Sequence, residues 1–412
     1  MDSYILQRID ECLDYDTRVD LRQVSHSYHL TLPPIIIGSD PLTHILTLTP
    51  NQMAEIALTY GFQRLLKYAI RQGYVSCNHG LFLACKGGYS SLITTLIDLG
   101  STDWNQGLKG ACRGGHAELA QEMIRRGAND LNQGLNGACE GGHEVLVQSM
   151  IQSGATDWNQ GLLGACRGGN VLLCQEMIDR GATNWNNGLY QACCAGNLPI
   201  VKLLINHGAD DLNWGLAGAC LWGHLDLVQL LITYGANDWN GGLCGACHGG
   251  HVMLCQEMID RGANNWNDGL GWACLGGHQE LIQEMMTRGA DNLNHGLEMA
   301  CQGGHPAFAQ LMIDKGATNW NDGLRGACQC GSLGLIQMLI KCGADNWNEG
   351  LHGACIGGHL RLVQMMIDLG ATDWNFGLTG ACIGKQDALC KEMIKKGANH
   401  CAWCQLVGDQ HH

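Results

Sequence analysis

The chain contains 412 residues, with 24 Lys or Arg against 38 Asp or Glu, which gives a formal net charge of −14 at pH 7. Binding to nucleic acid or to an anionic membrane draws on a surplus of Lys and Arg, so this acidic balance argues against both partners. No stretch of the sequence approaches the roughly 20 apolar residues that are needed to span a bilayer.

The first 32 residues lie outside any repeat and show helical periodicity. Ile9 and Leu13 fall on one face of a predicted helix, and a polar break separates them from a second apolar group. The N-terminus lacks a basic flank followed by an apolar run, so no secretory signal is expected. Residues 33–52 are punctuated by proline and partly apolar, which predicts a docked connector.

From residue 78 onwards the sequence repeats every 27 residues, twelve times in unbroken register. Each repeat has Asn at one position, Leu three places later and an Ala-Cys pair three places after that. Residues 53–77 fit the pattern loosely and form a degenerate thirteenth copy. Because one such unit cannot bury its apolar face alone, neighbouring copies must stack. We therefore predict an all-α elongated solenoid of about thirteen 27-residue repeats over residues 53–400, ended by a tail or cap over 401–412.

Each repeat, for example residues 104–130, is predicted to form helix, turn, helix and loop. Asn105 is predicted to cap the first helix, since an Asn side chain accepts a hydrogen bond from a first-turn amide. Gly127 is predicted to end the second helix in the left-handed conformation. The few residues between Gly127 and Asn132 leave no room for a β-hairpin. The side chains expected to face inward are Leu108, Ala111, Cys112, Leu119, Met123 and Ile124.

One internal string of the repeat resembles the ankyrin repeat. Its residues are Leu108, Ala111, Cys112, Gly115 and His116, followed by an apolar second helix and by Gly127 and Ala128. The repeat has 27 residues instead of the family's roughly 33, and its start is Trp-Asn-x-Gly instead of Thr-Pro. The resemblance implies a helical pair in each repeat and a platform that binds proteins, without the protruding hairpin.

The N-terminal helical element, residues 1–32, is similar to an F-box. The matching residues are Ile9, Leu13, Asp14, Thr17, Arg18, Leu21, Arg22, Val24, Ser25 and Tyr28. This resemblance implies contact with a Skp1-type adaptor of a host ubiquitin ligase through Ile9, Leu13, Leu21 and Val24. An F-box joined to short, regular ankyrin-like repeats also resembles proteins encoded in expanded families by large DNA viruses of amoebae, which implies a role in host–virus interaction.

Twelve of the 23 cysteines occupy one repeated position, where stacked helices would hold them roughly 8–10 Å apart. That spacing exceeds disulfide reach, so we expect thiols in a reducing compartment: the cytoplasm, of the host if the chain is viral, with the nucleus as the alternative. Pairs such as Cys112 and His116 could be zinc half-sites, but we favour a buried thiol and a turn-bonding imidazole. The tail with His400, Cys401 and Cys404 is a weaker metal candidate, and no metal or cofactor is predicted.

Two positions of the first helix vary freely: the residue after the repeated Leu and the residue four places later. They are basic in the early repeats and largely apolar in the middle and late ones. Trp222 and Trp272 replace Gly beside this stripe, and exposed aromatic side chains are good binding anchors. Unselected surface variation is the alternative explanation. The predicted partner-binding residues are Lys86, Lys109, Arg113, Arg167, Tyr190, Leu221, Trp222, Trp272 and Leu275.

The repeats contain no singular grouping of a nucleophile, a base and an orienting residue, so an enzyme is not expected. The sequence favours a noncatalytic adaptor whose repeats bind a target protein while the N-terminus recruits a Skp1–cullin ubiquitin ligase. The rival interpretation is a repeat scaffold with no link to a ubiquitin ligase, in which the first 32 residues only cap the stack.

Overall fold

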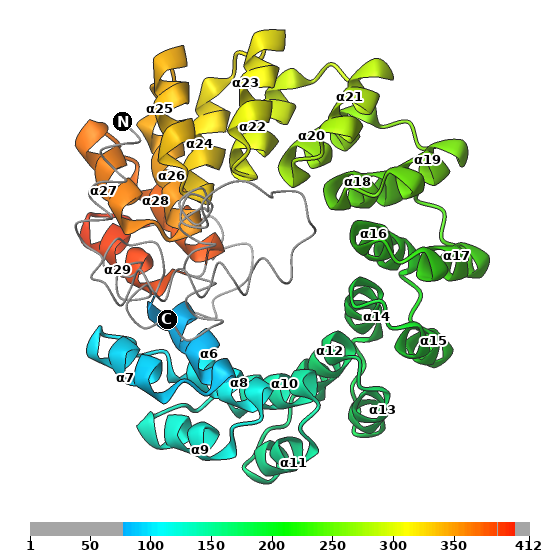
Figure 1. Cartoon of the computed structure of the whole chain (residues 1–412). Helices are drawn as coiled ribbons and strands as arrows, with labels where there is room; N and C mark the ends of the chain where they lie inside the picture. Colours follow the sequence, from blue (N-terminus) through cyan, green and yellow to red (C-terminus); the bar gives the residue numbers. More distant parts are fainter. Residues whose placement is uncertain (1–76, 385, 400–412) are drawn as a thin grey trace, which may run out of the picture. The chain divides into compact units, whose positions relative to one another are not determined.

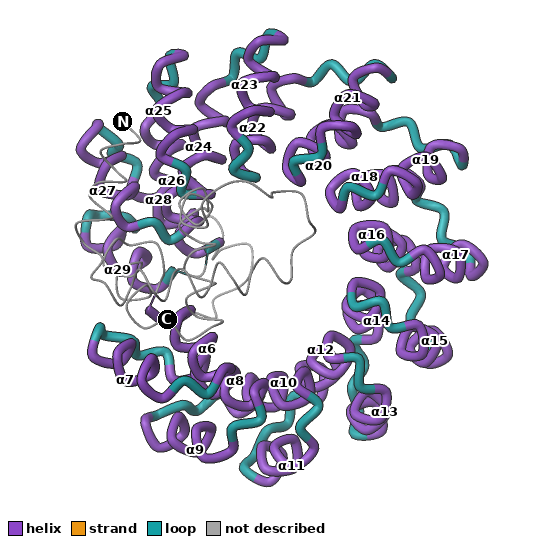
Figure 2. The backbone as a smooth tube through the Cα atoms, viewed as in Figure 1, coloured by secondary structure: helices purple, strands orange, loops and turns teal. Residues whose placement is uncertain are grey.

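The computed structural model describes residues 77–384 and 386–399, and every regular element in that part of the chain is a helix (Figure 2). The all-α prediction is therefore confirmed. No strand occurs among these residues, so the expectation that the repeats lack β-hairpins is confirmed there as well. The predicted F-box-like element, the connector, the degenerate first copy up to residue 76 and the tail at 401–412 lie outside the described residues.

The chain divides into two compact segments, Met1–Thr156 and Asp157–His412, which are described separately. The helices of the N-terminal segment are α6 (Cys77–Gly87), α7 (Ser90–Asp98), α8 (Trp104–Gly114), α9 (Ala117–Arg126), α10 (Leu131–Gly141) and α11 (Glu144–Gln152). Those of the C-terminal segment are α12 (Trp158–Gly168), α13 (Val171–Asp179), α14 (Trp185–Cys194), α15 (Leu198–His207), α16 (Leu212–Trp222), α17 (Leu225–Tyr234), α18 (Trp239–Gly249), α19 (Val252–Asp260), α20 (Trp266–Gly276), α21 (Gln279–Thr287), α22 (Leu293–Gln302), α23 (Pro306–Lys315), α24 (Trp320–Cys330), α25 (Leu333–Cys342), α26 (Trp347–Gly357), α27 (Leu360–Leu369), α28 (Trp374–Ile383) and α29 (Asp387–Lys395).

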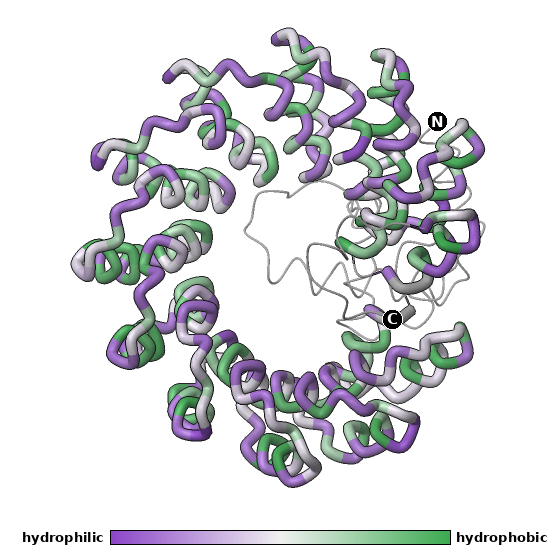
Figure 3. The backbone as a smooth tube through the Cα atoms, turned by 180° about the vertical axis from the view of Figure 1, so that it is seen from behind, coloured by the Kyte–Doolittle hydropathy of each residue, from purple (hydrophilic) through white to green (hydrophobic). Residues whose placement is uncertain are grey.

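Within each segment the helices form two layers (Figure 1). The even-numbered helix of a repeat is its first helix, and it packs against the first helix of the next repeat. The odd-numbered helix is the second helix, and it packs on the first helix of its own repeat. Hydrophobic and hydrophilic residues are mixed along the helices (Figure 3), as expected when one face is buried and the other is exposed.

The core of a repeat lies between its two helices and the first helix of the neighbouring repeat. On the first helix α8, Leu108, Ala111 and Cys112 are fully buried, as predicted. On the second helix α9 the buried residues are Ala120 and Met123. Met123 is therefore buried as predicted, whereas Leu119 and Ile124, which were also expected to face inward, are only half-buried.

The residue that caps each first helix is not the repeated Asn, and this prediction was wrong. Helix α8 begins at Trp104, and its N-cap is Asp103, whose carboxylate accepts a hydrogen bond from the amide of Gln106 at 3.1 Å. Asp or Asn occupies this cap position in every later repeat that the structure describes. Asn105 therefore lies inside the first turn of the helix, where its side chain is available for another contact.

The repeated Asn binds the loop of the following repeat. The Oδ1 atom of Asn105 accepts hydrogen bonds from the backbone amides of Asn129 and Asp130, both at 2.9 Å. The second amide belongs to the N-cap of the next first helix, so the bond places that helix. The same pair of bonds, 24 and 25 residues ahead, is made by Asn159, Asn186, Asn213, Asn240, Asn267, Asn294, Asn321 and Asn348.

The His of the turn provides the connection in the opposite direction. The Nε2 atom of His116 donates to the carbonyl of Lys86, 30 residues earlier, at 3.2 Å. That carbonyl lies in the last turn of the preceding first helix, where carbonyls lack a partner within the helix. The prediction of a turn-bonding imidazole is therefore confirmed. The other His residues that make this bond are His143, His224, His251, His278, His305 and His359.

Glycine in the first helix permits close approach between repeats. A Cβ atom on Gly110 would lie 2.2 Å from the backbone oxygen of Phe82 on the preceding first helix. Gln191, Trp272 and Met299 occupy this position in three later repeats.

In several repeats an Arg at the end of the second helix covers the Trp that begins the first helix. The Arg126 guanidinium lies 5.6 Å from the ring centre of Trp104, and its Nε donates to Glu122 at 2.8 Å. The same arrangement joins Arg180 to Trp158. Cation–π stacking of this kind stabilises partly exposed sites by about 0.5–1 kcal/mol.

Removing the carboxamide of Asn240 should loosen the loop that it holds. Asn240→Ala deletes the acceptor for the amides of Asn264 and Asn265, at 2.8 and 3.0 Å, and each bond contributes about 0.5–1.5 kcal/mol. Hydrogen exchange at these two amides should accelerate, whereas Asn240→Asp keeps the acceptor and should protect them. Equal protection in the Ala variant would show that the bonds do not hold the loop.

Protonation of the turn His should destabilise the array. Burial lowers the pKa of His359 below its ordinary value of 6.5, although the bond to the Gln329 carbonyl opposes the shift. At His359 the folded state then binds fewer protons than the unfolded state. The contribution of this residue to the free energy of unfolding is therefore present above the ordinary pKa and is lost as the pH falls through it, between about pH 7 and 5. His359→Asn removes the titrating group, and Asn197 makes a comparable turn bond, to Gly169 at 3.2 Å.

Urea denaturation at pH 7.5 and 5.5 is the measurement. The wild-type chain should lose more stability over this interval than His359→Asn. Identical pH dependence of the two proteins would refute the assignment.

Candidate protein-binding surface

The variable residues of the first helices lie on one side of each helix, and we call the surface that they form the first-helix surface. Besides the two positions predicted from the sequence, it includes a third, the residue after the repeated Asn. On α16 the three positions hold Trp214, Ala217 and Leu221, spaced by three and four residues and therefore on one helical face.

In the N-terminal segment the predicted basic residues have different environments. Lys86 is exposed at the end of α6, and Lys109 is half-buried on the adjacent helix α8. Arg113 forms an ion pair with Glu140 of α10 at 3.0 Å, and the side chain of Glu140 is only 7% exposed. Arg113 therefore links two repeats and contributes less to an outward positive charge than the sequence suggested.

The C-terminal segment carries an exposed group of aromatic residues. The rings of Tyr190 on α14 and Trp214 on α16 are stacked, with centroids 4.2 Å apart and planes inclined by 11°. Trp214 is 41% exposed, and Trp222 at the end of the same helix is 59% exposed. We call Tyr190, Cys194, Trp214 and Trp222 the aromatic cluster.

Packing beneath the rings holds the aromatic cluster together. A Cβ atom on Gly218 would lie 3.0 Å from the sulfur of Cys194 and 3.1 Å from the ring of Tyr190, so the glycine makes room for both. Burial raises the pKa of the Cys194 thiol, and hydrogen bonding with the Tyr190 and Trp222 side chains opposes that rise. The thiol is therefore part of the packing between the two aromatic side chains.

The other predicted apolar residues are less exposed. Trp272 on α20 is half-buried, and its ring lies 5.3 Å from the ring of His248 on α18. Leu221 and Leu275 are also half-buried. Arg167 is exposed on α12, but its Nε donates to the side chain of Gln191 at 2.9 Å.

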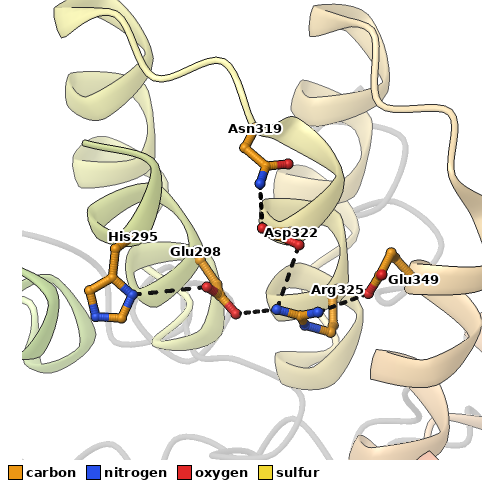
Figure 4. A network of polar contacts seen from close by, with 6 residues as sticks. All are labelled: His295, Glu298, Asn319, Asp322, Arg325 and Glu349. Atoms are coloured by element: carbon orange, nitrogen blue, oxygen red, sulfur yellow. Dashed lines mark hydrogen bonds and ion pairs between the residues drawn. The ribbon is translucent and has the colours of Figure 1, made fainter. Parts of the chain in front are cut away.

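Further along the C-terminal segment the first-helix surface is polar and internally paired (Figure 4). Arg325 on α24 binds Glu298 of α22 and Glu349 of α26, the latter at 2.9 Å, and so connects three repeats. His295 lies 3.9 Å from Glu298, and Asp322 lies 3.6 Å from Arg325. The expectation that the late part of the stripe is largely apolar is therefore wrong over these three helices.

The charges in this network stabilise one another. The neighbouring His295, with further contributions from Arg325, lowers the pKa of Glu298 despite burial. The Glu298 carboxylate in turn raises the pKa of His295. Because each carboxylate is held by a neighbouring cation or amide, the network fixes the relative positions of the helices.

The last pair of first helices is joined by a ring stack. His352 on α26 and Phe376 on α28 have centroids 3.9 Å apart and planes inclined by 4°, and the His352 Nδ1 lies 2.8 Å from the Phe376 carbonyl oxygen. His352 is buried, so the ring pair extends the packing between repeats.

Metal coordination has little support in residues 77–384 and 386–399. No group of three or more His, Cys, Asp or Glu in this range could hold a metal ion. The weaker metal candidate, with His400, Cys401 and Cys404, lies outside the described residues. None of the described helices has both the length and the apolar character needed to cross a membrane.

Sequence reasoning missed Trp214 and most of the polar network. Trp214, His295, Asp322, Glu349 and Phe376 all follow the repeated Asn directly, a position that also varies from repeat to repeat. This variation was the available signal. The position was overlooked because Asn was assigned to the helix cap, which would have placed the next residue at the helix end.

Comparison with known proteins supports the helical-pair assignment over part of the chain. Residues 162–241 match the family model "Ankyrin repeats (3 copies)". Among solved structures, the human ASB11 ankyrin repeat domain is similar, with 20% identity over 45% of this chain and 98% of that chain and a TM-score of 0.31. A comparison with curated proteins gives no match. The segment that matches the ankyrin family model contains the whole aromatic cluster.

Proposed function

We propose that this chain is a noncatalytic adaptor that binds a target protein through the first-helix surface of its repeats and recruits a Skp1-type adaptor through its N-terminus. The observation that carries the first part is the aromatic cluster. Two indole rings on α16 remain 41% and 59% exposed although buried positions are available throughout the repeat. Exposed Trp and Tyr side chains held in fixed positions are the commonest anchors of protein interfaces.

The second helices offer a weaker alternative surface. They also expose apolar side chains, such as Leu172 and Met253, which are 75% and 82% exposed. Each lies near the start of its helix beside one other exposed apolar residue, Val171 or Val252, and small exposed apolar groups are normal on soluble proteins. A cluster whose rings are stacked loses little side-chain freedom on binding, so the first-helix surface is the better candidate.

Charge and family likeness both favour a protein partner. The net charge of −14 opposes nucleic acid and anionic membranes. Ankyrin repeats, which residues 162–241 resemble, generally mediate protein–protein interaction. In the N-terminal segment, Lys86 and Lys109 would contribute at the rim of an interface, where charge affects the association rate more than the affinity. We expect these interactions in the cytoplasm, with the nucleus as the alternative.

The ubiquitin-ligase part of the proposal rests on the sequence alone. Ile9, Leu13, Leu21 and Val24 have the spacing of an F-box, and they lie outside the described residues. The rival is a scaffold that binds proteins without any ligase. The scaffold interpretation gains support from the contacts that Arg113, Arg167 and Arg325 make with neighbouring repeats. These contacts give each Arg a structural role, so its presence does not require a binding partner.

The aromatic cluster can be tested without disturbing the fold. Gly249 and Gly276 occupy the position of Trp222 in later repeats, so Trp222→Gly restores the usual residue of the repeat. Quantitative affinity capture followed by calorimetry of the purified partner should show a loss of about 2 kcal/mol, roughly thirtyfold in Kd. Met253→Ala is the control, since it removes from a second helix an apolar side chain that is even more exposed than Trp222, at 82% against 59%. If the two variants lost equal amounts of binding free energy, the aromatic cluster would not be the binding site.

Recruitment of the ligase adaptor has its own test. Changing Leu13 and Leu21 to Asp should abolish binding to purified Skp1, because two apolar contacts would be replaced by charges, while the helical circular-dichroism signal stays constant. Trp222→Gly should leave this binding intact. Failure of the wild-type chain to bind Skp1 would contradict the ligase proposal. The interpretation of the chain as a protein-binding scaffold would then remain.

A further inference from the structure

Three repeats contain a second buried or half-buried cysteine that touches the cysteine of the first helix. The sulfur atoms of Cys166 and Cys174 lie 3.7 Å apart, and those of Cys247 and Cys255 are separated by the same distance. The sulfurs of Cys382 and Cys390 lie 3.6 Å apart. The cysteines from Cys85 to Cys390 are thiols rather than disulfides.

The three pairs occupy the same place in the repeat. In each, one cysteine is the repeated core residue of the first helix and the other follows eight residues later on the second helix. Other repeats place Ala, Val or Ile at the second position, for example Ala120, Val201 and Ile282. The three pairs therefore have the same geometry in the same structural unit, and they differ in their surroundings.

Burial distinguishes the third pair from the other two. Cys166, Cys174 and Cys247 are 0% exposed and Cys255 is 2% exposed, because each pair lies between helices of neighbouring repeats. Cys382 and Cys390 are only half-buried, in helices α28 and α29 of the last repeat that the structure describes. The hydrogen bond to Cys174, followed by burial, raises the pKa of Cys166 far above its ordinary value, so that thiol is a poor nucleophile.

We propose that Cys382 and Cys390 are a thiol–disulfide modification site, which low-molecular-weight disulfides oxidise while the Cys166–Cys174 and Cys247–Cys255 pairs stay reduced. One thiolate attacks a sulfur of oxidised glutathione, forming a mixed disulfide and releasing one glutathione thiolate. The second thiolate attacks the protein sulfur of that mixed disulfide, forming the Cys382–Cys390 bond and releasing the second glutathione. The two protons lost by the cysteines pass to the two glutathione molecules, which are reduced as the pair is oxidised.

The geometry requires only a small local movement. The sulfurs must close from 3.6 Å to about 2.05 Å. Cys382 and Cys390 are half-buried and therefore less tightly packed than the inner pairs, which are 0–2% exposed. The bond would join the two helices of one repeat and restrict their separation when the end of the array opens.

Peptide mapping can detect the bond directly. The folded full chain is incubated with oxidised glutathione, the remaining thiols are alkylated, and the protein is digested with trypsin without reduction. Trypsin cuts between the two cysteines at Lys385, so the disulfide joins peptide 362–385 to peptide 386–391. We expect this linked species, and we expect Cys166, Cys174, Cys247 and Cys255 to be recovered in alkylated form.

The controls separate selectivity from general oxidation. Cys390→Ala should remove the linked species and leave the fold unchanged, because Ala120 and Ala309 fill the equivalent position in other repeats. Oxidation after unfolding in guanidinium should abolish the difference between the three pairs. Full alkylation of Cys382 and Cys390 in the folded chain, or equal oxidation of all three pairs, would overturn the proposal.

Discussion

The hydrogen bonds that the repeated Asn makes to the next loop are the constraint on which the rest of the array depends. One carboxamide oxygen accepts two consecutive backbone amides, and the second amide belongs to the residue that caps the following first helix. The position of one helix therefore sets the start of the next. The turn His acts at the other end of the first helix, where it binds a carbonyl 30 residues earlier. The polar groups left by short helices are thereby satisfied between repeats.

These two bonds explain why the repeat can be short. A short first helix gains little stability from its own hydrogen bonds, since helix nucleation is costly. Here the core residues Leu108, Ala111 and Cys112 bury one face completely, and glycines such as Gly110 allow the neighbouring backbone to approach. The stability of each repeat thus comes from its neighbours, as in other solenoids. The residues that make these contacts recur with little variation, so specific recognition is left to the positions that vary.

Much of the fold could be predicted from the sequence, because a strict period with Leu, Ala and Cys at helical spacing defines a buried face. The role of Asn105 could not be predicted by the same reasoning. Capping is a local preference, whereas the partners of this side chain lie 24 and 25 residues ahead and become neighbours only after stacking. Asp103 was the better candidate for the helix cap, since Asp is also favoured at that position. The network around Arg325 was missed for a related reason, since it depends on which side chains of three separate repeats meet.

The variable positions divide into residues that bind the array itself and residues that face outward. Arg325 and His352 belong to the first kind. Trp214 and Trp222 belong to the second, since a large part of each ring stays exposed. The same distinction between enclosed and accessible positions separates the Cys166–Cys174 pair from the Cys382–Cys390 pair. In a regular array, chemistry and recognition are expected where a residue departs from the repeat and is also accessible.

The most direct test of the central claim is an experimental structure of the full chain with a protein that it binds. The account predicts that Trp214 and Trp222 on α16 become buried in the contact, with the partner lying across the even-numbered helices. A partner seated on the odd-numbered helices, with both Trp side chains still exposed, would contradict it.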